Sequence, residues 1–287
     1  MLAVPARIAG CSEVILSTPP WKDGRCHPAV LVAADLCGIE SIYKIGGAQA
    51  IAAMAYGTET VPKVYKILGP GSPYVTTAKI LVYGVVDIDM PAGPSELLVI
   101  ADQGADPRWI AADLLAQLEH GEDSQGVLVT PSETLAERVV QEVKGQMNQS
   151  SRREIIRESV KNSFAVVVRS FDEACAIANA YAPEHLGVVV KKEADILKRI
   201  TNAGSVFLGG YASVSLGDYA TGANHTLPTS GFARVFSPLS TESFGKMIQV
   251  QKVTRKGIEN LRETVETLAM SEGLEGHKEA IRARFGC

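Results

Sequence analysis

The sequence has few of the features that mark a secreted, disulfide-stabilised or membrane-bound protein. It has five cysteines, an odd number, and none of them form a CxxC pair, which is typical of free thiols in a reducing compartment. The first residues lack the charged region and apolar run of a signal peptide. No apolar stretch approaches the ~20 residues that are needed to span a bilayer. We therefore expect a cytoplasmic protein that does not enter a membrane.

An excess of charge of either sign is also lacking. The 28 lysines and arginines stand against 32 aspartates and glutamates, which leaves a net charge of −4. The chain has no basic stripe, no arginine-rich arm and no aromatic pattern of an RNA-binding module, so we expect no nucleic-acid partner. Apolar residues make up 46% of the 287 residues, which is ordinary for a globular protein with one large domain or two smaller ones.

The glycine-rich fingerprint of common dinucleotide-binding folds is the last notable absence. No Gly-x-Gly-x-x-Gly follows any predicted strand. The residues by themselves therefore give no indication of NAD.

Short β-branched runs alternate with helical patterns in the first third of the chain. The pattern predicts helices at 28–36 and 48–56 and a third that ends near 82, and strands at 41–45, 64–68 and 85–89. Glycines stand between strands and helices. This rhythm indicates a parallel sheet with helices on its faces.

The same pattern restarts after Pro91 to Pro94. It predicts strands at 96–101, 126–130, 165–168, 187–190 and 203–208, with helices at 107–119, 132–143 and 171–181. We therefore predict two α/β domains, at 1–92 and 93–240. Residues 209–243 are rich in Gly, Ser, Thr and Asn, and such long irregular stretches are usually functional or mobile. Residues 257–285 read as one or two amphipathic helices, so 241–287 is predicted to be an arm that docks on a partner subunit.

Polar side chains that can carry chemistry gather in four places. Gln117 and His120 stand three residues apart at the end of a predicted helix, where they can share a face. Glu184 and His185 come just before a predicted strand. The other two groups are Asp218 with Asn224 and His225 in the irregular stretch, and Glu272 with His277 near the end of the chain.

Each group can also be explained without a function, as a helix cap or as solvated loop residues. Together their imidazole nitrogens and carboxylate or amide oxygens suit Zn²⁺ or Mn²⁺ better than a metal selected by thiolates. Spacing does not decide whether the four groups converge.

At this point the residues resemble the histidinol dehydrogenase family. The resemblance runs in family order over essentially the whole chain. It is carried by Thr18-Pro19-Pro20, residues 43–51, Gly69-Pro70-Gly71, residues 88–97 (Ile-Asp-Met-Pro-Ala-Gly-Pro-Ser-Glu-Leu), 116–121, 182–186, 217–219 with 224–229, and Glu272 with His277.

The resemblance implies two Rossmann-like, incomplete parallel-sheet domains and a C-terminal helical dimerisation arm. It implies zinc-dependent, four-electron oxidation of L-histidinol to L-histidine via histidinal with two NAD⁺, the last step of histidine biosynthesis. It also implies a homodimer with shared active sites and one Zn²⁺ per subunit.

The resemblance also assigns roles to residues of this chain. Glu184 and His185 match the acid/base pair, and Gln49 and Ser72 match NAD-contacting positions. The metal ligands would be Gln117, His120, Asp218 and His277, the last of them lent by the other subunit. The substrate contacts would be Ser95, Gln117, His120, His185, Asp218, His225, Glu272 and His277.

Two departures from the family pattern bear on these expectations. Ser72 stands where the family usually has Asn, and the shorter hydroxyl is expected to weaken NAD binding. Members of the family have a further segment before the point where this chain begins, with half of one α/β domain and a tyrosine that contacts NAD. The resemblance therefore implies an N-terminally truncated member whose second domain lacks its N-terminal half and exposes part of its sheet.

Two alternatives remain open beside the dehydrogenase. One is a non-catalytic, zinc-binding dimeric fragment. The other is a divergent NAD-dependent dehydrogenase of another amino alcohol, although His225 and Glu272 favour an imidazole substrate.

Overall fold

The computed structural model describes residues 1–91 and 93–286. Ala92, at the predicted domain boundary, and Cys287 lie outside the described residues. The chain divides into two compact units, Met1–Gly245 and Lys246–Cys287. None of the helices in the described part is long and apolar enough to cross a membrane.

The first part of the larger unit is built of short strands and helices. In chain order these are α1 (Ala3–Ile8), β1 (Ile15–Ser17), α2 (Pro28–Leu36), β2 (Ser41–Tyr43), α3 (Gly47–Tyr56), β3 (Lys66–Ile67), α4 (Pro73–Val82) and β4 (Asp87–Ile88). β1 pairs with β2 and β3 pairs with β4, both in parallel. The apolar faces of α3 and α4 share one core with Val61, Ile67 and Val86.

The strands of this part are parallel, as predicted, but they are shorter than the predicted ones. The described residues form two separate two-stranded sheets, with strands of only two or three residues. Helix α2 has the predicted bounds because Pro28 sits at its first position and the His27 side chain accepts the Ala29 N–H as a cap.

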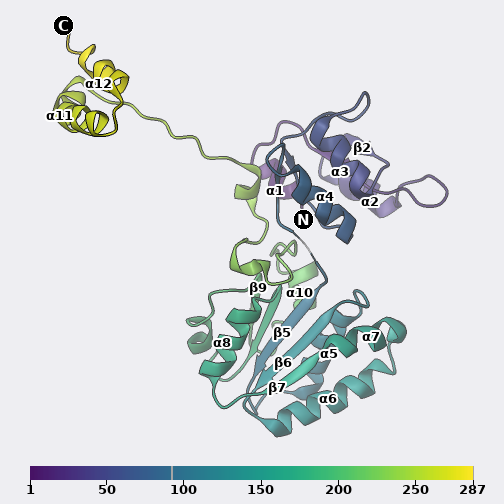
Figure 1. Ribbon diagram of the computed structural model, residues 1–287. Coiled ribbons are helices and arrows are strands. Elements are labelled where there is room, and N and C mark those ends of the chain that lie inside the picture. Colours follow the sequence, from purple (N-terminus) through teal and green to yellow (C-terminus); the bar gives the residue numbers. More distant parts are fainter. Residues whose placement is uncertain (92, 287) are drawn as a thin grey trace. The chain divides into compact units, whose positions relative to one another are not determined.

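The second part of this unit contains a five-stranded parallel sheet (Figure 1). Its order is β7-β6-β5-β8-β9, which is a doubly wound arrangement with the chain reversing direction across the sheet between β5 and β8. The strands are β5 (Glu96–Ala101), β6 (Gln125–Thr130), β7 (Phe164–Val167), β8 (His185–Val189) and β9 (Ser205–Leu208).

Helices cover both faces of the sheet, and the alternation of side chains along β5 shows how. Leu97 and Val99 pack against α5 (Pro107–Leu118), α6 (Glu133–Met147) and α7 (Arg153–Ser159). Leu98 and Ile100 pack against α8 (Phe171–Tyr181) and α9 (Glu193–Leu197). Figure 1 shows α8 on one side of the sheet and α5 to α7 on the other. Because both faces are covered, every residue of β5 is buried.

The stretch predicted to be irregular contains a short helix, α10 (Val214–Tyr219), as well as the 3₁₀ turns η2 (Phe232–Arg234) and η3 (Thr241–Phe244). α10 lies close against β9. A Cβ atom on Gly217 would stand 2.5 Å from the Phe207 ring, so only glycine fits at this contact. A helix with a central glycine has weak local signals, which is why the sequence pattern missed it.

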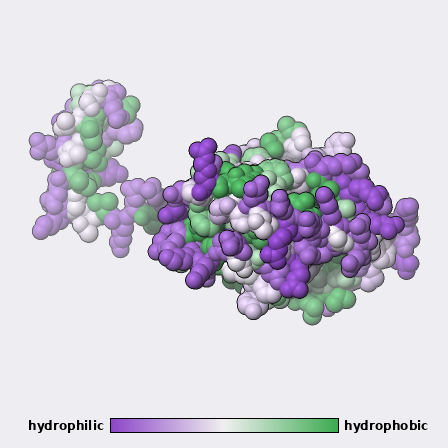
Figure 2. Space-filling model, turned by 90° about the horizontal axis from the view of Figure 1, so that it is seen from below, coloured by the Kyte–Doolittle hydropathy of each residue, from purple (hydrophilic) through white to green (hydrophobic). Residues whose placement is uncertain are grey.

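The smaller unit consists of two helices, α11 (Arg255–Ser271) and α12 (Glu275–Arg282). Gly273, with φ +70°, makes the turn between them, and Arg282 pairs with Glu266 across the hairpin at 3.0 Å. Apolar side chains lie between hydrophilic ones on the surface of this unit (Figure 2). The exposed apolar residues of α11 and the turn are Leu261, Leu268, Met270 and Leu274.

Candidate functional site

The polar cluster of the larger unit lies where the strands of the five-stranded sheet begin. Glu96 is the first residue of β5, and His185 is the first residue of β8, two residues before the start of the strand predicted there. These strands are neighbours, with Leu97 opposite His185. Ligands of doubly wound folds usually bind at the carboxyl ends of the strands, so this cluster occupies the opposite edge.

Glu184 is held by backbone and side-chain donors. Its Oε2 accepts the Glu96 N–H at 3.0 Å and a Gln117 Nε2 hydrogen at 3.4 Å. The residue is buried, so these two donors replace water at the carboxylate. The carboxylate is thereby fixed in front of the His185 ring.

His185 is a buried titratable side chain of the cluster. Its Nδ1 lies 3.3 Å from the Glu96 carbonyl oxygen and 3.5 Å from Glu184 Oε2. Both of these atoms are acceptors, so we assign the proton to Nδ1 and the lone pair to Nε2. Nε2 is buried without a hydrogen-bond partner, and the nearest acidic atom is Asp218 Oδ1 at 3.8 Å.

The charges around His185 set its basicity. Burial lowers the pKa of the imidazole, but hydrogen bonding to Glu184 and the charges of Glu184 and Asp218 outweigh burial and raise that pKa overall. A raised pKa makes Nε2 a stronger base. The cluster therefore presents one buried, unpartnered basic nitrogen.

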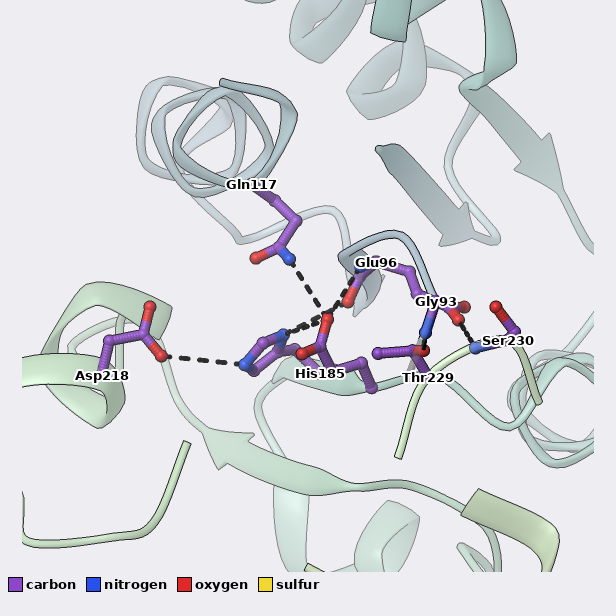
Figure 3. Close-up of polar contacts among 8 residues, drawn as sticks. Gly93, Glu96, Gln117, His185, Asp218, Thr229 and Ser230 are labelled. Atoms are coloured by element: carbon purple, nitrogen blue, oxygen red, sulfur yellow. Dashed lines mark hydrogen bonds and ion pairs between the residues drawn. The ribbon is translucent and has the colours of Figure 1, made fainter. Parts of the chain in front are cut away.

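Gln117 offers a second buried atom without a partner. Its Nε2 donates to Glu184, whereas its Oε1 is buried and has no hydrogen-bond partner. A buried carbonyl oxygen that is left unsatisfied is costly and commonly faces a ligand. Gln117 and Asp218 approach His185 from two sides (Figure 3). Their oxygens, together with an imidazole, are donors that suit zinc.

The other two predicted metal ligands are His120 and His277. Helix α5 ends at Leu118, so His120 lies just beyond the helix and is exposed, and its sharing a site with Gln117 stays a prediction. The chain leaves the helix there because the His120 N–H bonds to the Gln117 carbonyl at 3.3 Å. His277 belongs to the smaller unit. Among the described residues, no three His, Cys, Asp or Glu side chains are grouped to hold a metal.

Ser95 lies in a turn that is tied to the segment after His225. The Gly93 N–H donates to Thr229 Oγ1, and the Ser230 N–H donates to Glu96 Oε1 (Figure 3). Burial raises the pKa of Glu96, and the Ser230 N–H opposes that shift. An open cavity of about 620 Å³ adjoins this turn, lined among others by Ser95, Glu96, Gln125, Tyr181 and Arg234.

Glu96, Thr229 and Ser230 were missed by the sequence reading. The one signal for Glu96 was a carboxylate at the head of an otherwise apolar strand. His225 itself is exposed, and its neighbour Asn224 donates to the Met1 carbonyl at 3.0 Å.

The two predicted cofactor contacts stand at the starts of neighbouring helices. Gln49 is in the first turn of α3, and Ser72 precedes the first residue of α4; both are exposed. Gly47 has φ +76°, and a Cβ there would lie 2.8 Å from Gln49 Oε1. The backbone of the Gly46–Gly47 turn is therefore shaped around the Gln49 amide.

The remaining predicted contacts lie in the smaller unit. Glu272 caps the end of α11, and His277 is in α12; both are exposed. The structure thus gathers Gln117, Glu184, His185 and Asp218, while each unit carries part of the predicted substrate set.

Comparisons with known proteins identify the relatives of this chain. The sequence profile of the histidinol dehydrogenase family matches residues 1–285. Histidinol dehydrogenase of Bacteroides fragilis is 52% identical over 99% of the chain and 67% of its own length. That of Methanosarcina mazei is 50% identical over 100% of the chain and 66% of its own length.

A solved structure agrees with these sequence relatives. The crystal structure of histidinol dehydrogenase from Elizabethkingia anophelis matches with a TM-score of 0.97 and 48% identity, over 99% of this chain and 66% of that one. The chain therefore spans about two thirds of the length of the relatives that it matches.

Proposed function

The chain belongs to the histidinol dehydrogenase family of NAD-dependent oxidoreductases, and we propose that it oxidises L-histidinol to L-histidine through histidinal, with two NAD⁺ as hydride acceptors. This is the last step of histidine biosynthesis. The observation that carries the proposal is the buried pair of Glu184 and His185, beside which His185 Nε2 and Gln117 Oε1 both lack partners.

The first oxidation needs a base for the hydroxyl proton while hydride leaves the carbinol carbon. His185 Nε2 suits this role because it carries a lone pair and is screened from water. The proton would move to Nε2, and NAD⁺, when bound, would supply the hydride acceptor. The products are histidinal, NADH and a proton.

The second oxidation consumes water. Glu184 would accept a proton from the water that adds to the aldehyde carbon, giving a hydrate from which a second hydride passes to NAD⁺. The balance is one histidinol, two NAD⁺ and one water giving histidine as carboxylate, two NADH and three protons. His185 Nδ1 and Glu184 Oε2 are 3.5 Å apart, so the two side chains are close enough to act together in these proton transfers.

The unpartnered oxygen of Gln117 and the carboxylate of Asp218 fit a zinc site. We propose Gln117, His120 and Asp218 of one subunit and His277 of the other as its ligands. Zinc held there would orient the amine and imidazole nitrogens of histidinol. Ser95, His225 and Glu272 would complete the substrate contacts, and Gln49 and Ser72 those of NAD⁺.

A homodimer with shared sites follows from this ligand set. His277 and Glu272 stand on a helical hairpin whose exposed apolar side chains need a covering surface. We therefore keep residues 1–92 as the NAD-contacting domain, 93–240 as the metal and catalytic domain and 241–287 as the dimerisation arm. The cytoplasmic location stays a prediction from the sequence.

The test is NADH production from histidinol, measured before and after removal of metal by a chelator. The proposal predicts NADH formation that the chelator abolishes and that zinc restores. A folded, zinc-loaded dimer without activity would instead support the non-catalytic fragment. Faster NADH formation from another amino alcohol would support the divergent dehydrogenase.

A further inference from the structure

Lys79 is a charged side chain in the apolar interior of the first part of the larger unit. It lies in α4 and is 2% exposed. Its partner is Asp89, just after β4, and the two side chains are 3% and 1% exposed. Burying an ion pair costs several kcal/mol per ion, so such a pair persists only with good geometry and further hydrogen bonds.

The hydrogen bonds of this pair account for the whole ammonium group. Lys79 Nζ donates to Asp89 Oδ1, to the Gly69 carbonyl at 2.9 Å and to the Met90 carbonyl at 3.3 Å. Asp89 Oδ2 accepts the Gly69 N–H at 2.7 Å. An ammonium has three protons, and each has an acceptor here. Both backbone groups of Gly69 are bound to the same ion pair.

The ion pair therefore fixes the loop that leads into α4. Gly69 has φ +130°, a conformation that side chains disfavour, and a Cβ on Gly71 would stand 2.5 Å from Val75. The loop is thus held by the ion pair at one end and by close packing at the other. It ends at Ser72, which precedes the first residue of α4.

The same ion pair reaches the segment that leads to the candidate active site. Met90, whose carbonyl accepts from Lys79, is buried and stands a few residues before Ser95 and Glu96. One ammonium therefore joins the loop before Ser72 to the chain segment before Ser95.

We propose that Lys79 and Asp89 are positioning residues of the cofactor site, which hold residues 69–72 in the shape that receives NAD⁺. The identity of the ligand rests on the proposed function, whereas the anchoring of the loop does not. Neither side chain is accessible to a ligand, because both are buried. They act through the backbone of Gly69.

The experiment compares loss of the buried ion pair with loss of a neighbouring pair that is more exposed. Lys79→Met/Asp89→Leu removes both charges, so that no lone charge is left buried, and we expect the fold to be retained. Lys66→Met is the control, because Lys66 pairs with Asp87 on the adjacent ladder, where the side chains are 22% and 46% exposed. The readouts are amide hydrogen exchange of residues 69–72, NAD⁺ affinity by calorimetry, and thermal unfolding.

The double variant should exchange its 69–72 amides about tenfold faster and bind NAD⁺ about tenfold more weakly, as expected for lost hydrogen bonds to charged groups. Exchange in the peptide of β5 should not change. Lys66→Met should leave both readouts within about twofold of the parent, as expected for a partly exposed ion pair away from residues 69–72.

The outcomes separate the two proposals. Unchanged exchange at 69–72 in the double variant overturns the anchoring of the loop. Faster exchange with unchanged NAD⁺ affinity overturns the cofactor role. If the double variant unfolds, Lys79→Arg takes its place, because it keeps the positive charge but not the compact ammonium group. Unaltered amide exchange at 69–72 and unaltered NAD⁺ affinity in Lys79→Arg would refute the inference. If the parent chain does not bind NAD⁺, the proposed function and the cofactor role are both contradicted. Amide hydrogen exchange at residues 69–72 then still tests whether the ion pair anchors the loop.

Discussion

The larger unit holds its candidate chemistry in two different ways. Around the five-stranded sheet, Glu184, His185 and Gln117 are buried, and strand register and hydrogen bonds fix them. In residues 1–91, Gln49 and Ser72 are exposed, and glycine turns and a buried ion pair shape the backbone beside them. Groups that move protons need fixed positions in a dry place, whereas a groove for a large cofactor needs a shaped backbone.

The largest effect is expected from loss of His185, the proposed general base beside the five-stranded sheet. His185→Ala should lower kcat by 10²–10⁴-fold, the usual range for a lost general base, while zinc stays bound. Steady-state kinetics and elemental analysis check this. His27→Asn is the control, because Asn can keep the cap of α2. Loss of zinc from His185→Ala would mean that His185 is a ligand and not the base.

Removal of Gln117 Oε1, the buried oxygen without a hydrogen-bond partner, is expected to release the metal. Gln117→Leu should lower zinc affinity by about 100-fold or more, because a ligand is lost and not merely a supporting group. Gln117→Glu is the matched variant: it keeps an oxygen ligand but cannot donate to Glu184, so metal should stay while kcat falls. Metal titrations that give the same zinc affinity for Gln117→Leu and the parent would exclude this ligand.

A substitution in the Gly46–Gly47 turn should have a smaller effect, on NAD⁺ binding alone, and should not alter the site at the five-stranded sheet. Gly47→Ala strains a backbone with φ +76° and displaces the Gln49 amide. It should raise the KM for NAD⁺ about tenfold, from a strain of about 1–2 kcal/mol, with zinc content unchanged. Gly145→Ala, on the open face of α6, is the control. A fall in kcat without a change in the KM for NAD⁺ would contradict the assignment of NAD⁺ binding to this region and proton transfer to the other.

The smallest effect is on stability and comes from Asp113, on α5 close to the first residue of α10. Burial raises the pKa of Asp113 to about 6, and the Val214 N–H opposes the shift. Because the folded-state pKa lies above the unfolded value, the carboxyl destabilises the fold as pH rises through about 6 and has no such effect below about 4.

Asp113→Asn keeps an acceptor for Val214 but cannot ionise. It should therefore raise the free energy of unfolding by about 1 kcal/mol at pH 8, the scale for a partly exposed group, and leave it unchanged at pH 4. Urea unfolding at both pH values measures this. Equal stability of variant and parent at pH 8 would show that the carboxyl is fully solvated.

Elements with strong local signals were predictable from the sequence. β5 and α8 have the predicted bounds, since β5 is an unbroken apolar run and the Ser170 side chain caps α8. The existence of α10 was not predictable, because it depends on a tertiary contact, the packing of Gly217 against Phe207.

The site was predictable only in pieces. The sequence pointed to Glu184 and His185 and, separately, to Gln117 and Asp218. It could not show that Glu96 meets Glu184, because that contact depends on β5 and β8 being neighbours across 88 residues of chain. The buried Lys79 also gave no signal, since a lysine in a helix is normally solvated.

The stoichiometry of the reaction tests the central claim most directly. Zinc-loaded protein is given limiting histidinol and excess NAD⁺, and NADH and histidine are both counted. One enzyme with a single base and a water-activating carboxylate predicts two NADH and one histidine for each histidinol consumed. One NADH with histidinal left over, or no NADH from a folded zinc-loaded dimer, would contradict it.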